Sequence, residues 1–496
     1  MAFAISLPRA GARLLAIATT AILVWFGYGL NPWWPLMWFA PIPVLLFSAH
    51  ASWRSAAGAA GISWFLGLLS IWHYLHSVLG VPFFACLAIL LGQALAFTVA
   101  VLLSRALLLR GASWSALLAF PAMFTSIEYL HNLTSVHGTG GSLAYTQLGF
   151  LKFLQLASIT GPWGMVFLLL LFPSAVAVGL HLRATAPMKA IGVVASSIGV
   201  IVLVLVFGSM RLASPPPAGS LVKVGLVASD FGGNEKVADA GAPTERLLAE
   251  YGKQAELLAA QGAQVVVMPE KLGAAVDPYT GNADAVMQEV ADTSGVAIVA
   301  GVVRVTSPLR YNQARIYLPG AAAVSSYDKH HMLPPFESNL TPGTTRALLK
   351  HGSAVWGVAI CKDMDFTGLS RAYGRDGAGL MLVPAWDFFV DRTFHGHEAI
   401  MRGVESGFGI VRAAKGGYLT VSDNRGRVLA EVRSDESVPF TTMVAEVPDI
   451  HDKTLYLSLG DWFAWVTLAI LLTCCLPFFE SRRGPVRDGE GDAGGS

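Results

Sequence analysis

Three residues of the chain, Glu270, Lys329 and Cys361, have side chains suited to covalent catalysis, and each stands at or just past the end of an apolar run. A cysteine becomes a nucleophile when a base takes its proton, and a carboxylate near a cation can serve as that base. A lysine ammonium beside them can hold the negative charge of a tetrahedral oxyanion. The trio therefore predicts a Glu270 base, a Cys361 nucleophile and a Lys329 oxyanion partner.

Each of the three has an ordinary structural explanation when taken alone. A glutamate after a strand can be a solvated loop charge, a cysteine with apolar neighbours can be an inert core residue, and a lysine can lie at the surface. Their order along the chain, each close behind an apolar run, favours the catalytic interpretation. Cys361 is also the only one of four cysteines outside the apolar segments, so no disulfide within the water-soluble part explains it.

The elements that must position these residues lie between 221 and 455, where charge is ordinary and short apolar runs alternate with amphipathic helices. Helices are predicted near 244–260 and 395–406. This alternation predicts an α/β domain, in which side chains just past strand ends build the site. The predicted strands are 221–229, 264–268, 296–305, 314–318, 356–361, 380–384 and 418–422.

The rest of the chain is too apolar for water. Overall 54% of residues are hydrophobic and only 14% are charged, and the charges are sparse before 210. Stretches of roughly 17 to 25 apolar residues, long enough to cross about 30 Å of hydrocarbon, predict about seven transmembrane helices in a membrane domain over 1–210. Another transmembrane helix is predicted at 459–479, followed by a disordered cytoplasmic tail at 481–496. The predicted spans before the α/β domain lie near 14–30, 34–50, 55–76, 82–104, 114–131, 162–182 and 189–209.

Lysine and arginine are distributed unevenly between the loops of the membrane domain. With the N-terminus inside, the predicted cytoplasmic segments hold nearly all of them, and the short outside loops hold only Lys152. By the positive-inside rule, the α/β domain at 221–455 then lies outside the cytoplasm. The net charge of +1 gives no indication of nucleic acid.

Several segments of the sequence together resemble a known family. The three segments look like the Glu-Lys-Cys signatures of the nitrilase superfamily, whose fold is an α-β-β-α sandwich. The membrane half, with Glu128-Tyr-Leu and the stretch 154–164, is similar to the E-W-L-R and I-Q-x-A-x-x-x-G-x-x-G stretches of the apolipoprotein N-acyltransferase family. The run from Lys329 to Glu337, K-H-H-M-L-P-P-F-E, is similar to that family's K-x-H-L-V-P-F-G-E, whose final Glu is essential.

The resemblance implies an activity and its participants. An acyl chain would pass from a phospholipid to the Cys361 thiol as a thioester, and then to the N-terminal amine of a diacylglyceryl-cysteine lipoprotein. Glu337 would support the triad, and no cofactor or metal would take part. The enzyme would be a multi-pass protein of the inner (cytoplasmic) membrane, with its catalytic domain on the periplasmic side.

Several positions depart from the family pattern. Lys362 and Asp363 follow Cys361 in place of an aromatic residue and a glutamate, and Asp363 is predicted to support the site. Lys271 replaces a serine or threonine after Glu270, and 228–230 and 137–142 differ from the family's Q-x-N and T-G-F-P-W stretches. These positions are expected to shape the mouth of the pocket.

Other interpretations stay open beside this one. The same triad serves a membrane-anchored amidase in which water resolves the acyl-enzyme, or a degenerate homologue that binds lipoprotein without turnover. Lys362 would either favour the Cys361 thiolate or point to water. His395-Gly-His397-Glu398 is expected to be a helix start and not a metal site, because no further ligand stands nearby in the sequence.

Overall fold

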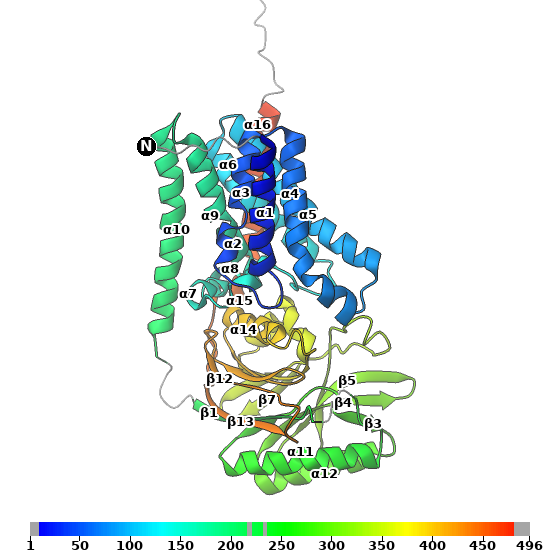
Figure 1. Ribbon diagram of the computed structural model, residues 1–496. Helices are drawn as coiled ribbons and strands as arrows, with labels where there is room; N and C mark the ends of the chain where they lie inside the picture. The colour runs from blue at the N-terminus through cyan, green and yellow to red at the C-terminus, as the bar shows by residue number, and fades with distance from the viewer. Residues whose placement is uncertain (1–8, 216–220, 232–235, 481–496) are drawn as a thin grey trace, which may run out of the picture.

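The computed structural model describes residues 9–215, 221–231 and 236–480. A bundle of helices forms one end of the molecule and an α/β domain forms the other (Figure 1). The helix α16 (Trp462–Glu480) follows the α/β domain in sequence and returns to the bundle, where it packs against α6 (Ser113–Asn132). The predicted fold class, a helical membrane domain with an α-β-β-α sandwich, is confirmed.

Four described helices are long and apolar enough to cross a membrane, namely α1, α5, α9 and α10. The predicted stretch 34–50 is divided at Pro41 into two short helices, because a proline inside a helix removes a backbone hydrogen bond. The predicted count of about seven spans stays a prediction. The bundle helices are α1 (Arg9–Gly27), α2 (Leu36–Phe39), α3 (Ile42–His50), α4 (Trp53–Leu68), α5 (Phe83–Leu109), α6, α7 (Leu151–Leu154), α8 (Ala157–Thr160), α9 (Pro162–Leu182) and α10 (Pro187–Ala213).

The first sheet of the α/β domain has the order β13-β1-β2-β4-β5-β6, with β3 beside β4. Its central strands β1, β2 and β4 are parallel, with Val224 opposite Val265 and Val265 opposite Ala297. Parallel strands end at the same edge of a sheet, so the residues that follow them gather there. The strands are β1 (Leu221–Ala228), β2 (Val265–Val267), β3 (Gly273–Val276), β4 (Ala297–Thr306), β5 (Leu309–Tyr317), β6 (Ser325–Asp328) and β13 (Thr441–Pro448).

The second sheet has the order β12-β11-β10-β9-β8-β7, again with parallel strands at its centre. Leu382 of β9 lies opposite Val358 of β8 on one side and Val411 of β10 on the other. The strands are β7 (Ala347–His351), β8 (Ala354–Val358), β9 (Ala378–Trp386), β10 (Gly409–Lys415), β11 (Tyr418–Ser422) and β12 (Val428–Arg433).

Alternation along the strands divides the buried side chains between two layers. Val224 and Leu226 of β1 join the core between the two sheets, whereas Val227 packs with α11 (Ala242–Ala260) and α12 (Thr280–Ser294) on the outer face. On the second sheet, α13 (Thr367–Arg375) and α14 (Phe394–Ser406) pack against β9 and β10. The result is four layers, helix, sheet, sheet and helix.

The helix α14 lies between the second sheet and the bundle, with the short α15 (Leu455–Leu459) beside it (Figure 1). Buried polar contacts join the two halves here. Gly161, which has a φ of +64°, brings the start of α9 against the ring of Tyr456, and a Cβ at this glycine would lie 2.3 Å from that ring. The close fit fixes the α/β domain against the bundle.

Candidate active site

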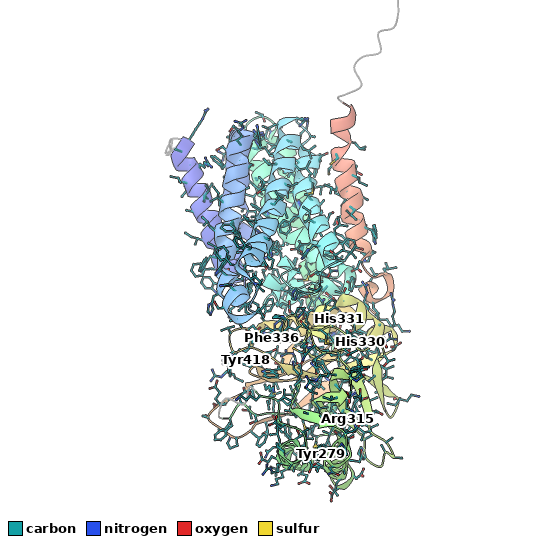
Figure 2. The ribbon with its side chains drawn as sticks, turned by 90° about the vertical axis from the view of Figure 1, so that its right-hand side faces the viewer. Tyr279, Arg315, His330, His331, Phe336 and Tyr418 are labelled. Atoms are coloured by element: carbon teal, nitrogen blue, oxygen red, sulfur yellow. The ribbon has the colours of Figure 1, made fainter. Side chains whose placement is uncertain are left out.

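The three residues predicted to do chemistry come from three different loops and meet at one cavity. Glu270 lies just beyond β2, Lys329 directly follows β6, and Cys361 begins a short 3-10 turn (Cys361–Asp365) just beyond β8. All three line the same cavity of about 450 Å³. Phe336 also lines this cavity, and it lies in the part of the α/β domain near the bundle, whereas Tyr279 lies at the remote end (Figure 2).

Lys329 is held between two glutamates. Its Nζ donates to Glu270 Oε1 at 3.0 Å and to Glu337 Oε2 at 2.8 Å, and all three side chains are buried. Burial alone lowers the pKa of a lysine, but here the two carboxylates outweigh it and hold the Lys329 pKa well above its ordinary value. Lys329 is therefore a fixed positive charge beside the cavity.

Glu337, chosen from the sequence by its spacing from Lys329, reaches this network across a chain reversal. Its Oε2 also accepts the backbone N–H of Leu333 at 2.9 Å. Burial raises the pKa of this carboxyl, but Lys329 and Lys271 outweigh burial and bring the pKa well below its ordinary range. Glu337 is thus ionised and shares Lys329 with Glu270.

Two further members of the network were not predicted from the sequence. The amide of Asn312, in β5, donates to Glu270 Oε1 at 2.5 Å and to Glu337 Oε1 at 2.6 Å. Lys271 donates to Glu337 Oε1 at 2.8 Å. In the sequence, Asn312 stands just before the predicted strand 314–318, and Lys271 directly follows the candidate base. Neither position by itself indicates its partner.

Cys361 has a backbone φ of +43°, in the left-handed region that side chains other than glycine rarely adopt. Such strain is tolerated where the surrounding structure enforces it, often at functional sites. The Sγ points to the carbonyl of Trp386 at 3.7 Å. Burial, aided by the charge of Glu270 and opposed by Lys329, raises the pKa of the thiol to about 12. Cys361 therefore rests as a thiol and needs a base to become a nucleophile.

Glu270 has one oxygen available for that task. Oε1 is occupied by Lys329 and Asn312, whereas the buried Oε2 accepts no hydrogen bond within the described part of the chain. A buried acceptor without a partner is costly, and a proton arriving from the thiol would satisfy it.

Asp363, predicted to support the site, contacts the two loops that carry Lys329 and Cys361. Its Oδ1 accepts the backbone N–H groups of His330 at 3.1 Å and His331 at 2.9 Å. Its Oδ2 accepts the hydroxyl of Tyr327 at 2.7 Å and the N–H of Ile360 at 3.1 Å. Asp363 thus ties both loops together without lining the cavity.

Lys362 does not point to water, so one of its two predicted alternatives is wrong. The side chain is buried, and its Nζ lies 2.6 Å from Nδ1 of His137, in the loop after α6. Burial lowers the pKa of Lys362, and burial together with Lys362 lowers that of His137 to about 4. The residue after the candidate nucleophile therefore contacts the bundle half, and the loop 137–142 does not line the cavity as expected.

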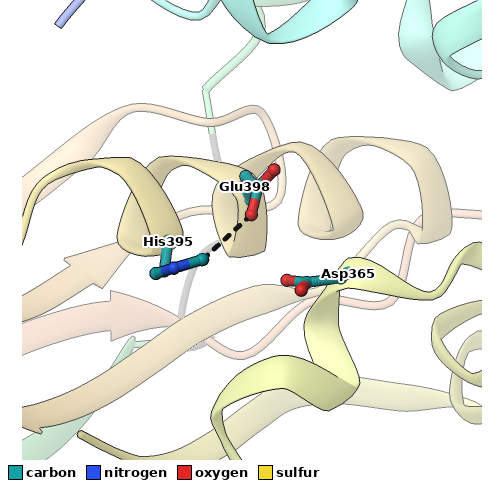
Figure 3. A group of neighbouring side chains, drawn as sticks. All are labelled: Asp365, His395 and Glu398. Carbon is teal, nitrogen blue, oxygen red and sulfur yellow. Dashed lines mark hydrogen bonds and ion pairs between the residues drawn. The ribbon is translucent and has the colours of Figure 1, made fainter. Parts of the chain in front are cut away.

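Asp365, His395 and Glu398 lie close together at the start of α14 (Figure 3), with one ligand atom from each within 4.8 Å of the others. The third member, Asp365, is distant in the sequence and arrives from the turn after Cys361. Both ring nitrogens of His395 already have protein partners, Glu398 Oε2 at 3.1 Å and Asp391 Oδ2 at 3.2 Å. The group is accounted for as a histidine between carboxylates, at the predicted helix start.

Comparison with known proteins matches both halves of the chain. Residues 20–175 match the apolipoprotein N-acyltransferase N-terminal domain, and residues 239–438 match the carbon-nitrogen hydrolase domain. The site therefore belongs to a carbon-nitrogen hydrolase domain carried by a membrane protein.

Individual proteins similar to this chain give a more specific comparison than the two domains. The chain is 27% identical over 389 residues to an apolipoprotein N-acyltransferase of Geobacter metallireducens, covering 72% of this chain and 73% of that one. It is 23% identical over 476 residues to one of Gloeobacter violaceus, covering 89% of each. A crystal structure of an amidase from Nesterenkonia sp. is 20% identical with a TM-score of 0.41, covering 52% of this chain and 99% of that one. The chain is thus similar, over most of its length, to proteins named apolipoprotein N-acyltransferase.

Proposed function

We propose that this enzyme transfers an acyl chain from a phospholipid, through a thioester on Cys361, to the N-terminal amine of a diacylglyceryl-cysteine lipoprotein. The observation that carries the proposal is the placement of Cys361 beside a glutamate with a free oxygen and a lysine held as a cation, all on one cavity. A membrane anchor on the same chain suits two substrates that both reside in lipid.

In the first half-reaction, Glu270 Oε2 takes the proton of the Cys361 thiol as Sγ attacks the ester carbonyl of the donor. Lys329 and the backbone N–H that follows the cysteine stabilise the oxyanion of the tetrahedral intermediate. The C–O bond of the ester then breaks, and the departing alkoxide takes the proton back from Glu270. The products are a lysophospholipid and an acylated Cys361.

In the second half-reaction, the neutral amine of the acceptor attacks the thioester carbonyl, and Glu270 takes one proton from the attacking nitrogen. Collapse of the intermediate breaks the C–S bond, and the departing Cys361 thiolate regains the proton. The product is an amide, and the enzyme returns to its starting state. Asp363 would act by holding the loops in place, and Glu337 by holding Lys329.

The deciding experiment is intact mass analysis of a synthetic diacylated lipopeptide after incubation with the purified full-length enzyme and phospholipid vesicles. The expected product gains one acyl chain, and the Cys361→Ser enzyme should give none. If the enzyme preparation is folded and the mass of the lipopeptide stays unchanged, the result counts against the proposal.

A second candidate activity is hydrolysis of an amide by the same residues. Polar side chains, among them Arg310, Asn339 and Asp239, line part of the cavity, and a polar entrance would admit water. Water in place of the acceptor amine would then resolve the acyl-enzyme. The fate of the thioester separates the two, because a transferase shields it from water and an amidase does not.

A further inference from the structure

Lys271 occupies a position that the catalytic scheme above does not use, although it lines the same cavity. It directly follows Glu270, where the resembled family has serine or threonine. The backbone of Lys271 has a φ of +53°, so this residue, like Cys361, is held in the left-handed region despite carrying a side chain. A strained backbone next to the candidate base indicates that the direction of this side chain is enforced.

The ammonium of Lys271 faces both glutamates of the site. Its Nζ lies 2.8 Å from Glu337 Oε1 and 3.6 Å from Glu270 Oε1, and the side chain is 16% exposed. Lys329 contacts the other oxygen of Glu337, so each carboxylate oxygen of Glu337 has its own ammonium. Glu337 is thereby fixed from both sides.

The surroundings hold Lys271 in this direction. Its Nζ lies 5.3 Å from the ring centre of Trp386, and its backbone carbonyl accepts from the ammonium of Lys415 at 3.2 Å. Trp386 is also the residue whose carbonyl faces the Cys361 thiol. Lys271 is therefore packed against the residue that orients the nucleophile.

We propose that Lys271 is a positioning residue: its ammonium holds Glu337 in place and supplies a second positive charge that favours the thiolate of Cys361. The catalytic meaning of this inference rests on the proposed acyl transfer. The reason is the net charge of the site. Glu270 and Glu337 carry two negative charges, and Lys329 alone would neutralise only one of them. With Lys271 the four charges sum to zero, and a negative charge on sulfur costs less.

One further pair of charges acts on Cys361, and the two charges of this pair cancel. Arg412 donates to the carboxylate of Asp387 from both terminal guanidinium nitrogens, from Nη1 at 2.7 Å and from Nη2 at 2.5 Å. Lys415 lies on the face of Trp386, 3.5 Å from its ring centre, and burial lowers its pKa to about 7. Removing Lys271 should therefore leave the site with less positive charge, and Lys415 should offset this loss only in part, because Lys271 is one of the charges that lower its pKa.

The test measures alkylation of Cys361 by iodoacetamide against pH in the full-length enzyme, a readout that needs neither phospholipid nor lipoprotein. Lys271→Met keeps the shape of the chain and removes the charge. It should slow alkylation about tenfold at each pH at which the enzyme stays folded, because the thiolate fraction falls tenfold when the pKa of the thiol rises by about one unit. Lys271→Arg, which keeps the charge, should retain the wild-type profile, as should Lys253→Met on the exposed face of α11.

Loss of one partner of a buried ion pair can also impair folding, so a double variant completes the test. Lys271→Met with Glu337→Gln removes one charge of each sign and should bring the alkylation rate at a given pH back toward wild type. The inference is overturned if Lys271→Met folds and shows the wild-type profile, or if the double variant keeps the shifted one. If the wild-type enzyme acylates no lipopeptide but the profiles behave as expected, the acyl transfer fails and the role of Lys271 stands.

Discussion

At the scale of single residues, Cys361 should accumulate as an acyl thioester when phospholipid is supplied without an amine acceptor. A thioester lies close enough in free energy to the donor ester for the first half-reaction to proceed alone, whereas amide formation drains it. Peptide mass analysis after digestion should find a hydroxylamine-labile acyl adduct on the Cys361 peptide. Cys361→Ser should lack this thioester, and Glu270→Gln, which cannot take the thiol proton, should fail to form it.

The lifetime of that adduct distinguishes the candidate activities. Slow loss in buffer and rapid loss on addition of diacylglyceryl peptide supports acyl transfer, whereas rapid loss in buffer alone supports the amidase. A wild-type enzyme that never forms the adduct would count against both.

Glu337 should matter for turnover although it does not contact the thiol in this structure. Glu337→Gln keeps the size of the side chain but replaces two charge-assisted contacts to Lys329 and Lys271, each of about 1.5–3 kcal/mol. We expect turnover to fall about tenfold to a hundredfold. Wild-type turnover in a lipopeptide assay of this variant would show that the similarity of the 329–337 segment to its family has no functional weight here.

Glu337 also makes stability depend on pH. Because its pKa is depressed in the folded protein, its contribution to the free energy of unfolding is present above the ordinary glutamate pKa and is lost as pH falls through the depressed folded value. The thermal midpoint of the wild-type enzyme should therefore drop on acidification below about pH 4.5. Glu337→Gln should show a smaller drop over the same range, and an identical drop would contradict this assignment.

At the scale of elements, the site depends on Asp363 joining the loop after β6 to the turn after β8. Asp363→Asn replaces one carboxylate oxygen by an amide that cannot accept the hydrogen bonds now made by Tyr327 and Ile360, or those of His330 and His331. An unsatisfied buried group costs about 1–3 kcal/mol. We expect a lower thermal midpoint and slower thioester formation, both measured on the same preparation, with Lys253→Met as an unaffected control.

The secondary-structure elements also show how much of the fold could be predicted from the sequence. The parallel strands β2, β8 and β9 are continuous apolar runs and could be predicted, because both of their faces are buried. The sequence does not predict the edge strands β7 and β12, which are mostly exposed and lack such a run. It also does not predict the buried central strand β10, whose apolar run is interrupted by Arg412. Glu270, Lys329 and Cys361 could be predicted as site residues because each closely follows a strand.

Contacts between segments that are distant in the sequence could not be predicted from it. Asn312 reaches Glu270 only because β5 returns antiparallel to β4, and Asp365 reaches His395 only because two loops meet at α14. The sequence marks Lys271 as a departure from the family pattern, but its partner Glu337 lies beyond four intervening strands, β3 to β6. Pairing of side chains across the fold depends on register, which no single stretch of sequence specifies.

At the scale of the whole molecule, the two halves are joined by buried polar contacts that include the turn carrying Cys361. Thr139 of the loop after α6 donates its hydroxyl to the carbonyl of Asp365 at 2.9 Å, and Tyr74 donates to Asp391 at 2.7 Å. Lys362 contacts His137 in the same region. The geometry of the nucleophile turn is therefore coupled to the bundle, so the α/β domain expressed alone would lack part of its support.

The charges at the ends of the helices predict which side of the membrane holds the α/β domain. The Pro187 end of α10 lies at the end of the bundle remote from the α/β domain, and α10 runs toward that domain (Figure 1). The predicted cytoplasmic residues Arg54, Arg110 and Lys189 flank helix ends Trp53, Leu109 and Pro187. Because short cytoplasmic loops carry an excess of lysine and arginine, we expect the α/β domain on the opposite, periplasmic side.

Alkaline phosphatase, which folds only where disulfides form, should be active when fused after residue 230. The same reporter fused after Arg110 should be inactive, and an inactive fusion after 230 from a stably expressed protein would overturn the proposed topology.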